Sequence, residues 1–106
     1  MPREKFQTLT EQMFYILLCM RSECCGMDVM AKVGELTGGR VTVGPGTLYH
    51  LLEQFCDAGW IRETKCEGRR RSYILTRWGR EALEREVARL KQQTADFYRC
   101  MGEGEQ

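Results

Sequence analysis

The sequence predicts a mainly α-helical α+β fold, in which three helices precede a two-stranded hairpin and a long helix ends the chain. Three observations predict it. Apolar residues recur at helical spacing in three segments before Trp60. Two short runs of strand-forming residues then flank a turn that contains Gly68. A helical pattern resumes after Thr76 and continues for about 25 residues.

Length and composition indicate one modest globular domain. The chain has 106 residues, of which 42% are apolar and 29% are charged, as in ordinary soluble proteins. Its longest apolar run, residues 13–20, is too short to cross a bilayer. No secretory signal precedes that run, so we expect a cytoplasmic protein with no membrane partner.

Charge is distributed unevenly along the chain. A formal net charge of +1 does not by itself indicate a nucleic-acid-binding protein. Between Arg62 and Arg80, however, seven basic residues stand against two acidic ones, a local balance of +5. Any attraction for nucleic-acid phosphates is therefore expected to come from this segment.

The first helix is expected to begin after Thr8 and to end near Arg21. Thr8 and Glu11 have the spacing of a capping box, in which a hydroxyl and a carboxylate satisfy free backbone N–H groups. Apolar residues then cover nearly the whole circumference of the helix. Such a helix is expected to be buried on more than one side.

Two further helices follow before the hairpin. The second is expected over residues 27–36, where a pair of glycines stops it. Residues 41–43 alternate valine and threonine and predict a very short strand. The third helix is expected to start near Pro45, whose fixed φ suits a first helical position, and to stop at Gly59. Its inward face is made of four apolar residues, Leu48, Leu51, Leu52 and Phe55.

A basic hairpin and a long helix complete the chain. The hairpin strands are expected at residues 60–65 and 71–75, joined by a charged connection over residues 66–70. Thr76 is suited to cap a final helix over residues 77–101. The remaining residues are expected to form a frayed tail.

The final helix carries an apolar seam of the coiled-coil kind. Its members are spaced alternately four and three residues apart, with Thr94 as one polar interruption. A chain of this length has little other core to cover so long a seam. We expect its first turns to pack against the chain's own helices and its far end to meet a second copy in a two-fold homodimer. The candidate dimer interface consists of Leu83, Val87, Leu90, Phe97 and Met101.

This order of elements is that of a winged helix-turn-helix domain with a C-terminal dimerisation helix. Residues 1–76 are expected to form the DNA-binding domain, and residues 77–106 the dimerisation helix and a short tail, in one compact unit. In such domains the second helix of the motif, here the third of the chain, lies in the major groove. Gly44 and Gly46 would let its first turn approach a phosphate closely. The candidate DNA contacts are Gly46, Thr47, Tyr49, His50, Arg69, Arg70 and Arg71.

These candidates also have purely structural explanations. Glycines beside a proline occur in plain turns, and Tyr49 could simply cover the hairpin. A run of arginines in a turn is commonly a solvated charge run. His50 is the only histidine and has no cysteine or carboxylate partner at a useful spacing, so we expect a surface residue that faces the groove, and neither a catalytic base nor a metal ligand.

Three stretches of the sequence resemble the PadR family of bacterial transcriptional regulators, in particular its short members with a single C-terminal helix. They are LTEQMFYILL, ELTGGRVTVGPGTLYHLLEQF and GRRRSYILTRWGREAL. The resemblance implies a homodimer, usually a repressor, that binds a palindromic operator and releases it on an inducing signal. By position it assigns Thr47 and Tyr49 to the recognition helix and residues 68–71 to the wing. Gly79 matches the family's LTxxG pattern, and its missing side chain would let the last helix approach the hairpin closely.

The resemblance also implies an apolar cleft for an inducer between the dimer helices. Family members respond to phenolic acids, planar cationic drugs or other signals. The candidate cleft residues here are Phe14, Tyr15 and Trp78, which makes a small hydrophobic or aromatic inducer a candidate partner. Aromatic residues beside a helix seam are also common in plain core packing.

Cysteine is abundant and suggests a first alternative function. Reduced thiols are expected in a cytoplasmic chain, with Cys19 and Cys56 acting as small hydrophobes on apolar helix faces. Cys24, Cys25 and Cys66 are expected in exposed connections. A thiol- or metal-responsive regulator that uses Cys24 and Cys25 is therefore an alternative, although no C-x-x-C pair is present.

A second alternative is a winged helix that makes protein contacts only. An enzyme is not expected, because the sequence has no glycine-rich nucleotide loop and no nucleophile elbow. The sequence accordingly predicts no catalytic residue, no cofactor and no metal ligand.

Overall fold

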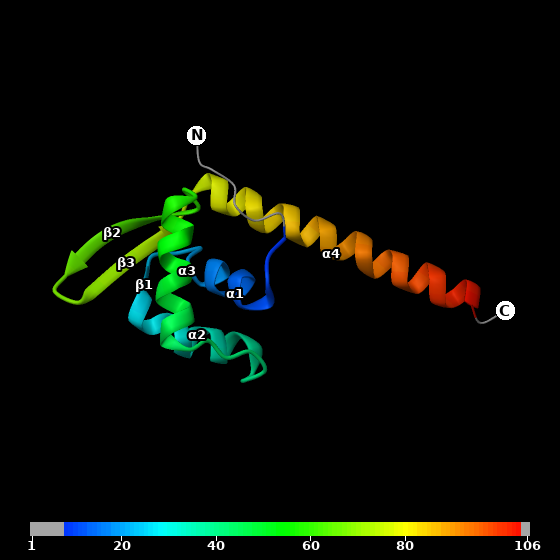
Figure 1. The fold of residues 1–106 in the computed structure, drawn as a ribbon, viewed down its shortest axis with the longest axis horizontal. Helices are drawn as coiled ribbons and strands as arrows, with labels where there is room; N and C mark the ends of the chain where they lie inside the picture. Colours follow the sequence, from blue (N-terminus) through cyan, green and yellow to red (C-terminus); the bar gives the residue numbers. More distant parts are fainter. Residues whose placement is uncertain (1–7, 105–106) are drawn as a thin grey trace.

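The computed structural model describes residues 8–104, which form four helices and a three-stranded antiparallel sheet (Figure 1). The elements in chain order are α1 (Glu11–Cys19), β1 (Cys24–Cys25), α2 (Gly26–Thr37), α3 (Pro45–Asp57), β2 (Ile61–Glu67), β3 (Arg70–Leu75) and α4 (Arg77–Gly104). The strand order is β1-β3-β2. Helices α1 to α3 gather beside the sheet, whereas α4 extends away from them as a long arm. The predicted α+β winged-helix fold is confirmed.

The N-cap of helix α1 lies two residues later in the chain than predicted. The N-cap is Thr10, whose hydroxyl accepts a hydrogen bond from the Met13 amide at 3.2 Å, while the Met13 sulfur accepts one from the Thr10 amide at 3.4 Å. The prediction that Thr8 and Glu11 form the capping box was wrong, because Thr10 adopts the extended cap conformation and Glu11 is already helical. The helix also ends at Cys19, before Arg21. Its buried residues confirm burial on more than one side: Met13, Ile16, Leu17 and Cys19.

Strand β1 was not predicted from the sequence. Cys24 pairs with Tyr73 and Cys25 with Ser72, which adds a third strand to the hairpin. Both cysteines are buried, so the prediction that they lie in an exposed connection was wrong. A two-residue strand has no period of its own and forms only because β3 offers a free edge.

The segment after α2 joins no strand. Gly38 ends α2 in the left-handed conformation, with φ at 61°. The Val41 amide donates to the Thr37 hydroxyl at 3.1 Å, and the side chains of Val41 and Val43 are buried. The predicted short strand at residues 41–43 was wrong, because a side chain takes the backbone hydrogen bond that a neighbouring strand would need.

Helix α3 forms as predicted, from Pro45 at its first position to an end just before Gly59. Gly59 has φ at 78°, which the chain needs in order to turn from the helix into the hairpin. Phe55 stacks on Trp60 beyond the turn, with ring centroids 5.9 Å apart. The four predicted inward residues are all buried: Leu48, Leu51, Leu52 and Phe55. This packing fixes which side of α3 faces solvent.

The β2–β3 hairpin, called the wing below, is longer than predicted. Its turn is confined to Gly68 and Arg69, with Gly68 at φ 62°. Arg70 and Arg71 were predicted in or next to the connection, but they are the first two residues of β3. The longer pairing includes Arg70 and Arg71 and leaves Arg69 in the turn.

The first turn of α4 packs directly on the wing. The Thr76 hydroxyl accepts a hydrogen bond from the Gly79 amide at 3.2 Å, as expected of a cap. A Cβ atom at Gly79 would lie 2.1 Å from the Trp60 carbonyl oxygen, so only glycine allows this approach. The close contact predicted at Gly79 is confirmed.

Helix α4 is the longest element, with 28 residues. It continues past the predicted end at residue 101 to Gly104, and residues 1–7 and 105–106 lie outside the described residues. Within residues 8–104 no helix is both long and apolar enough to cross a membrane.

Candidate nucleic-acid interface

The outward face of α3 holds the four candidates predicted on this helix. Gly46, Thr47, Tyr49 and His50 are all exposed, whereas Leu48 between them is fully buried. Tyr49 is 50% exposed, although it is an aromatic residue of a small domain. The structure therefore brings these four residues to one solvent-facing surface.

The glycines at the start of α3 have no role in the packing of this chain. A Cβ atom at either Gly44 or Gly46 would meet nothing within 4 Å. Neither residue has a positive φ, so the backbone does not require glycine there. Gly44 is also the N-cap and offers no side chain to the amides of the first turn. This helix start is thus narrow and presents free backbone N–H groups, which suits an anion.

A groove of about 660 Å³ lies between α3 and the wing. Its wing side includes Gly68, Arg69 and Arg71, and its α3 side includes Tyr49. Thr47, His50 and Arg70 are not in its lining. We call this surface the wing groove; the rest of its lining is Gly26, Met27, Leu52, Glu53, Cys56, Asp57, Glu63 and Tyr73.

Two of the three wing arginines have acidic neighbours within the chain. Arg70 pairs with Asp28 and Arg71 with Glu63, each at 3.5 Å. The Glu63 carboxylate raises the pKa of the Arg71 guanidinium further above its ordinary value. Within residues 8–104, Arg69 makes no ion pair. Exposed pairs of this kind contribute little to stability, so a phosphate can replace either acid.

The burial of the cysteines differs from the exposure that was predicted for a thiol- or metal-responsive regulator. Burial raises the pKa of Cys19 to about 11 and also raises that of Cys24, which disfavours the reactive thiolate. Cys56 was expected on an apolar face but is exposed, while Cys66 is exposed as expected. Among residues 8–104, no three His, Cys, Asp or Glu side chains are grouped so that they could hold a metal ion.

A smaller cleft of about 290 Å³ separates α1 from α4, and it includes two of the three predicted inducer residues. Phe14 and Tyr15 are in its lining, but Trp78 is not. Trp78 lies at the start of α4, where the Arg77 guanidinium stands 4.6 Å from its ring centre. We call this space the α1–α4 cleft.

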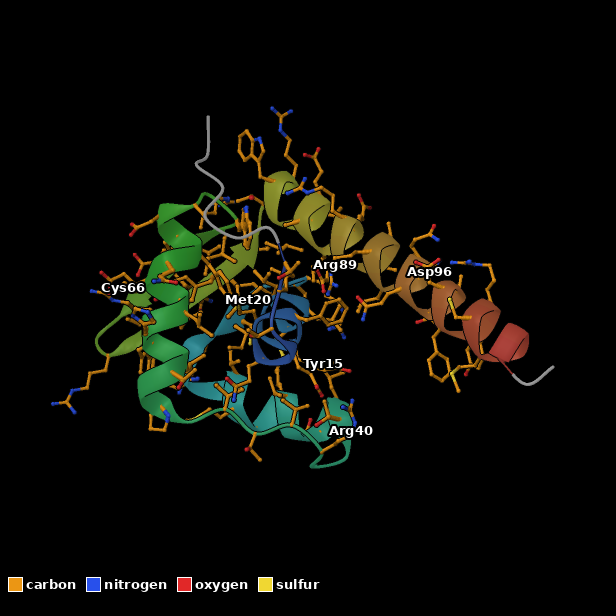
Figure 2. The ribbon with its side chains drawn as sticks, turned by 45° about the vertical axis from the view of Figure 1, so that its right-hand side comes forward. Tyr15, Met20, Arg40, Cys66, Arg89 and Asp96 are labelled. Carbon is orange, nitrogen blue, oxygen red and sulfur yellow. The ribbon has the colours of Figure 1, made fainter. Side chains whose placement is uncertain are left out.

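Charged residues surround the α1–α4 cleft. Figure 2 shows Tyr15 and Arg40 pointing toward one another, and the Arg40 guanidinium donates to the Tyr15 hydroxyl at 3.0 Å. On the α4 side, Arg89 bonds the Glu86 carboxylate, which also accepts a hydrogen bond from the Leu9 amide at 3.2 Å. Glu86 is 4% exposed, and no sequence pattern pointed to a buried acid there. These contacts fasten α4 to the start of α1.

The seam on α4 is covered only at its beginning. Leu83 is 8% exposed because the domain itself packs on it. Its other apolar members are Val87, Leu90, Phe97 and Met101, which are 37% to 57% exposed. Tyr98, which the sequence analysis did not single out, lies beside the seam and is 69% exposed. The far half of α4 therefore presents large apolar side chains to solvent.

Comparison with known proteins shows which family and which relative the sequence is similar to. The profile described as the Transcriptional regulator PadR-like family matches residues 16–85. An uncharacterized 37.1 kDa protein in transposon TN4556 of Streptomyces fradiae is 37% identical over 62 residues, which are 58% of this chain and only 17% of that protein.

Solved structures show the same fold. RosR of H. salinarum superposes with a TM-score of 0.64 at 24% identity, over 84% of this chain and 77% of that one. A transcriptional regulator from Clostridium thermocellum gives a TM-score of 0.70 at 15% identity, over 84% and 90% of the two chains. The circadian clock associated protein Pex from Anabaena gives 0.54 at 19% identity, over 86% and 84%.

Proposed function

Because the chain belongs to the PadR-like family of transcriptional regulators, we propose that it is a cytoplasmic, homodimeric repressor that binds a palindromic DNA operator. The observation that supports DNA binding most is the start of α3. Gly44 and Gly46 leave open space that the fold does not need. A phosphate strand that passes close to the backbone would explain why side chains are absent there.

The side chains around this start can supply the remaining contacts. The Thr47 and Tyr49 hydroxyls can donate to phosphate oxygens, and His50 can reach a phosphate or a base-edge acceptor. Arg69, Arg70 and Arg71 add positive charge at the end of the wing, where they can bind the backbone or enter the minor groove. Tyr49, Arg69 and Arg71 line the wing groove, and Thr47, His50 and Arg70 are exposed outside it.

A homodimer would present two such surfaces to the two halves of a palindrome. Its support is the seam, because Val87, Leu90, Phe97 and Met101 stay exposed in a single chain. Burying four large apolar side chains is the usual driving force for helix association. Leu83 belongs mainly to the domain core and would lie at the margin of this interface.

The α1–α4 cleft is the candidate site for an inducer that releases the operator. The α1–α4 cleft adjoins the seam through Leu90, so a small aromatic ligand there would act on the dimer contact. Phe14 and Tyr15 would contact the ligand, whereas Trp78 would not. Regulation through Cys24 and Cys25 has less support, because both thiols are buried in the fold.

The test is a fluorescence anisotropy titration at two salt concentrations, with the duplex upstream of the gene and a scrambled duplex of equal length. Preference for the upstream duplex, with affinity that falls as salt rises, is the expected result. Equal, salt-sensitive binding to both would leave only a basic surface. No binding to either duplex at low salt would favour the alternative of a winged helix used for protein contacts.

A further inference from the structure

Helix α3 has no lysine or arginine, and this distinguishes it from the wing. Its residues from Pro45 to Asp57 include no lysine or arginine, but they include two acids, Glu53 and Asp57. Both acids are exposed and line the wing groove. A carboxylate near phosphates is electrostatically unfavourable, so a helix that only gripped the DNA backbone would gain nothing from these residues.

Glu53 is placed to reach base edges. It follows Tyr49 by four positions and His50 by three, so it shares their face of the helix. Burial of Leu52 on the other side keeps this face turned outward. Glu53 lies eight residues after Pro45, about 12 Å along the axis from the helix start that enters the major groove under the proposed function.

The carboxylate of Glu53 has no donor from its own chain. Among residues 8–104 it makes no hydrogen bond and no ion pair, unlike Glu63 across the groove, which pairs with Arg71. An ionised carboxylate only accepts hydrogen bonds. Its oxygens are therefore available to an external N–H donor, while Arg69 and Arg71 in the same groove offset the cost of its charge near DNA.

We propose that Glu53 determines sequence specificity by accepting a hydrogen bond from the N4 amino group of one cytosine in each operator half-site. This inference rests on the proposed function. In the major groove, cytosine presents a donor, guanine presents the acceptors N7 and O6, and thymine presents the acceptor O4. Adenine presents its N6 donor beside the N7 acceptor, which repels the second carboxylate oxygen. A carboxylate therefore selects cytosine.

Asp57 offers a matched control. It lies four residues farther along α3, about 18 Å from the helix start, and its side chain is one methylene shorter. It lines the same groove with the same charge, but it lies one turn farther from the N-terminal turns of the helix, which are the part that contacts base edges in such motifs. Removing its charge should change general attraction to DNA and leave base preference unchanged.

The experiment is an in vitro selection from duplexes with randomised half-sites, performed with the full chain and with Glu53→Ala, Glu53→Gln and Asp57→Asn. The wild type and Asp57→Asn should enrich cytosine at one position of each half-site, by about tenfold over the other bases. Glu53→Ala should lose that preference alone. Glu53→Gln should change it to adenine, because a glutamine amide pairs with both N6 and N7 of adenine.

Two results would overturn the inference, and they are distinguishable. If both Glu53 variants keep the wild-type preference and bind every duplex more tightly, Glu53 only repels phosphates. If the wild type enriches no sequence at all, the proposed operator binding fails together with this inference. Circular dichroism of each variant checks that the exposed substitutions leave the helices intact.

Discussion

At the scale of single residues, Gly79 is the position where side-chain size matters most for the fold. A Cβ atom there would lie 2.1 Å from the Trp60 carbonyl oxygen and 2.7 Å from a Leu75 methyl carbon. The carbonyl belongs to the backbone and cannot rotate away. The start of α4 and the hairpin must therefore separate if any other residue replaces this glycine.

Gly79→Ala should accordingly lower the free energy of unfolding by about 1 to 3 kcal/mol, as forced overpacking does. Urea denaturation followed by circular dichroism would measure the loss. Gly34→Ala is the control, since a Cβ atom there meets nothing within 4 Å and alanine favours a helix. Equal stability of Gly79→Ala and the wild type would contradict the close contact.

Glu86 should make stability depend on acid pH. The Arg89 guanidinium lowers the pKa of the Glu86 carboxyl below its ordinary value of 4.5, and the Leu9 amide adds to the effect. A lowered pKa in the folded state contributes stability above pH 4.5, and this contribution is lost as pH falls through the folded value.

Glu86→Gln should therefore be about 1 kcal/mol less stable than the wild type at pH 7, through the lost charge-assisted hydrogen bonds. The difference should shrink as pH falls below 4.5. Urea unfolding at a series of pH values tests both statements. A gap that stays constant down to pH 2 would rule out the Glu86 carboxylate as its source.

At the scale of elements, the sequence predicted the helices and the wing but not the smallest pieces. The apolar period of α3 and the glycine after it are local signals, and both were interpreted correctly. Strand β1 depends on β3, a partner distant in the chain, and local patterns contain no information about such a partner. The path of residues 41–43 depends on the Thr37 side chain, four residues before Val41, which takes the Val41 amide that a strand would need.

The same distinction applies to the candidate site. The exposed face of α3 follows from helical spacing alone, so Thr47, Tyr49 and His50 could be placed on one surface from the sequence. The ion pair of Arg70 with Asp28 could not be predicted, because β3 and α2 meet only in the folded chain. The wing groove could not be predicted either, because its shape depends on the angle at which α3 packs against the hairpin.

Arg70→Ala should weaken operator binding and reduce the dependence of log affinity on log salt by about one unit, the effect of one lost phosphate contact.

Tyr49→Phe should weaken binding without changing the fold, because the exposed ring keeps its place and loses only a hydroxyl. Anisotropy titrations over a salt series measure both effects. Arg21→Ala is the control, since the Arg21 guanidinium bonds the Leu18 carbonyl of its own helix end at 2.9 Å. Wild-type affinity and salt dependence in both variants would remove these residues from the interface.

At the scale of the whole molecule, the shape of the chain is that of a domain with an arm. The molecule measures 62 Å along its longest axis and 34 Å along the next, and α4 accounts for the excess (Figure 1). The arm leaves the domain just where its seam becomes exposed. An isolated monomer would keep these apolar side chains in water, which favours association.

Phe97→Asp should convert the dimer into a monomer, because it places a charge in the middle of the exposed seam. Sedimentation velocity on wild type and variant would show the change in mass. Gln92→Ser is the control, since Gln92 is exposed on α4 outside the seam. A wild type that sediments as a monomer at micromolar concentration would contradict the proposed homodimer.

The proposed DNA contact at the glycine-rich start of α3 can be tested by one comparison of affinities. The affinity for the upstream duplex is measured for the wild type, Gly46→Leu and Gly34→Leu, two variants in which the new Cβ atom meets nothing within 4 Å of the chain. Gly46→Leu should keep the stability of the wild type and lose operator affinity by about tenfold or more, while Gly34→Leu binds normally. Wild-type affinity in Gly46→Leu would contradict the claim, since a bulky side chain cannot fit where backbone and phosphate are in contact.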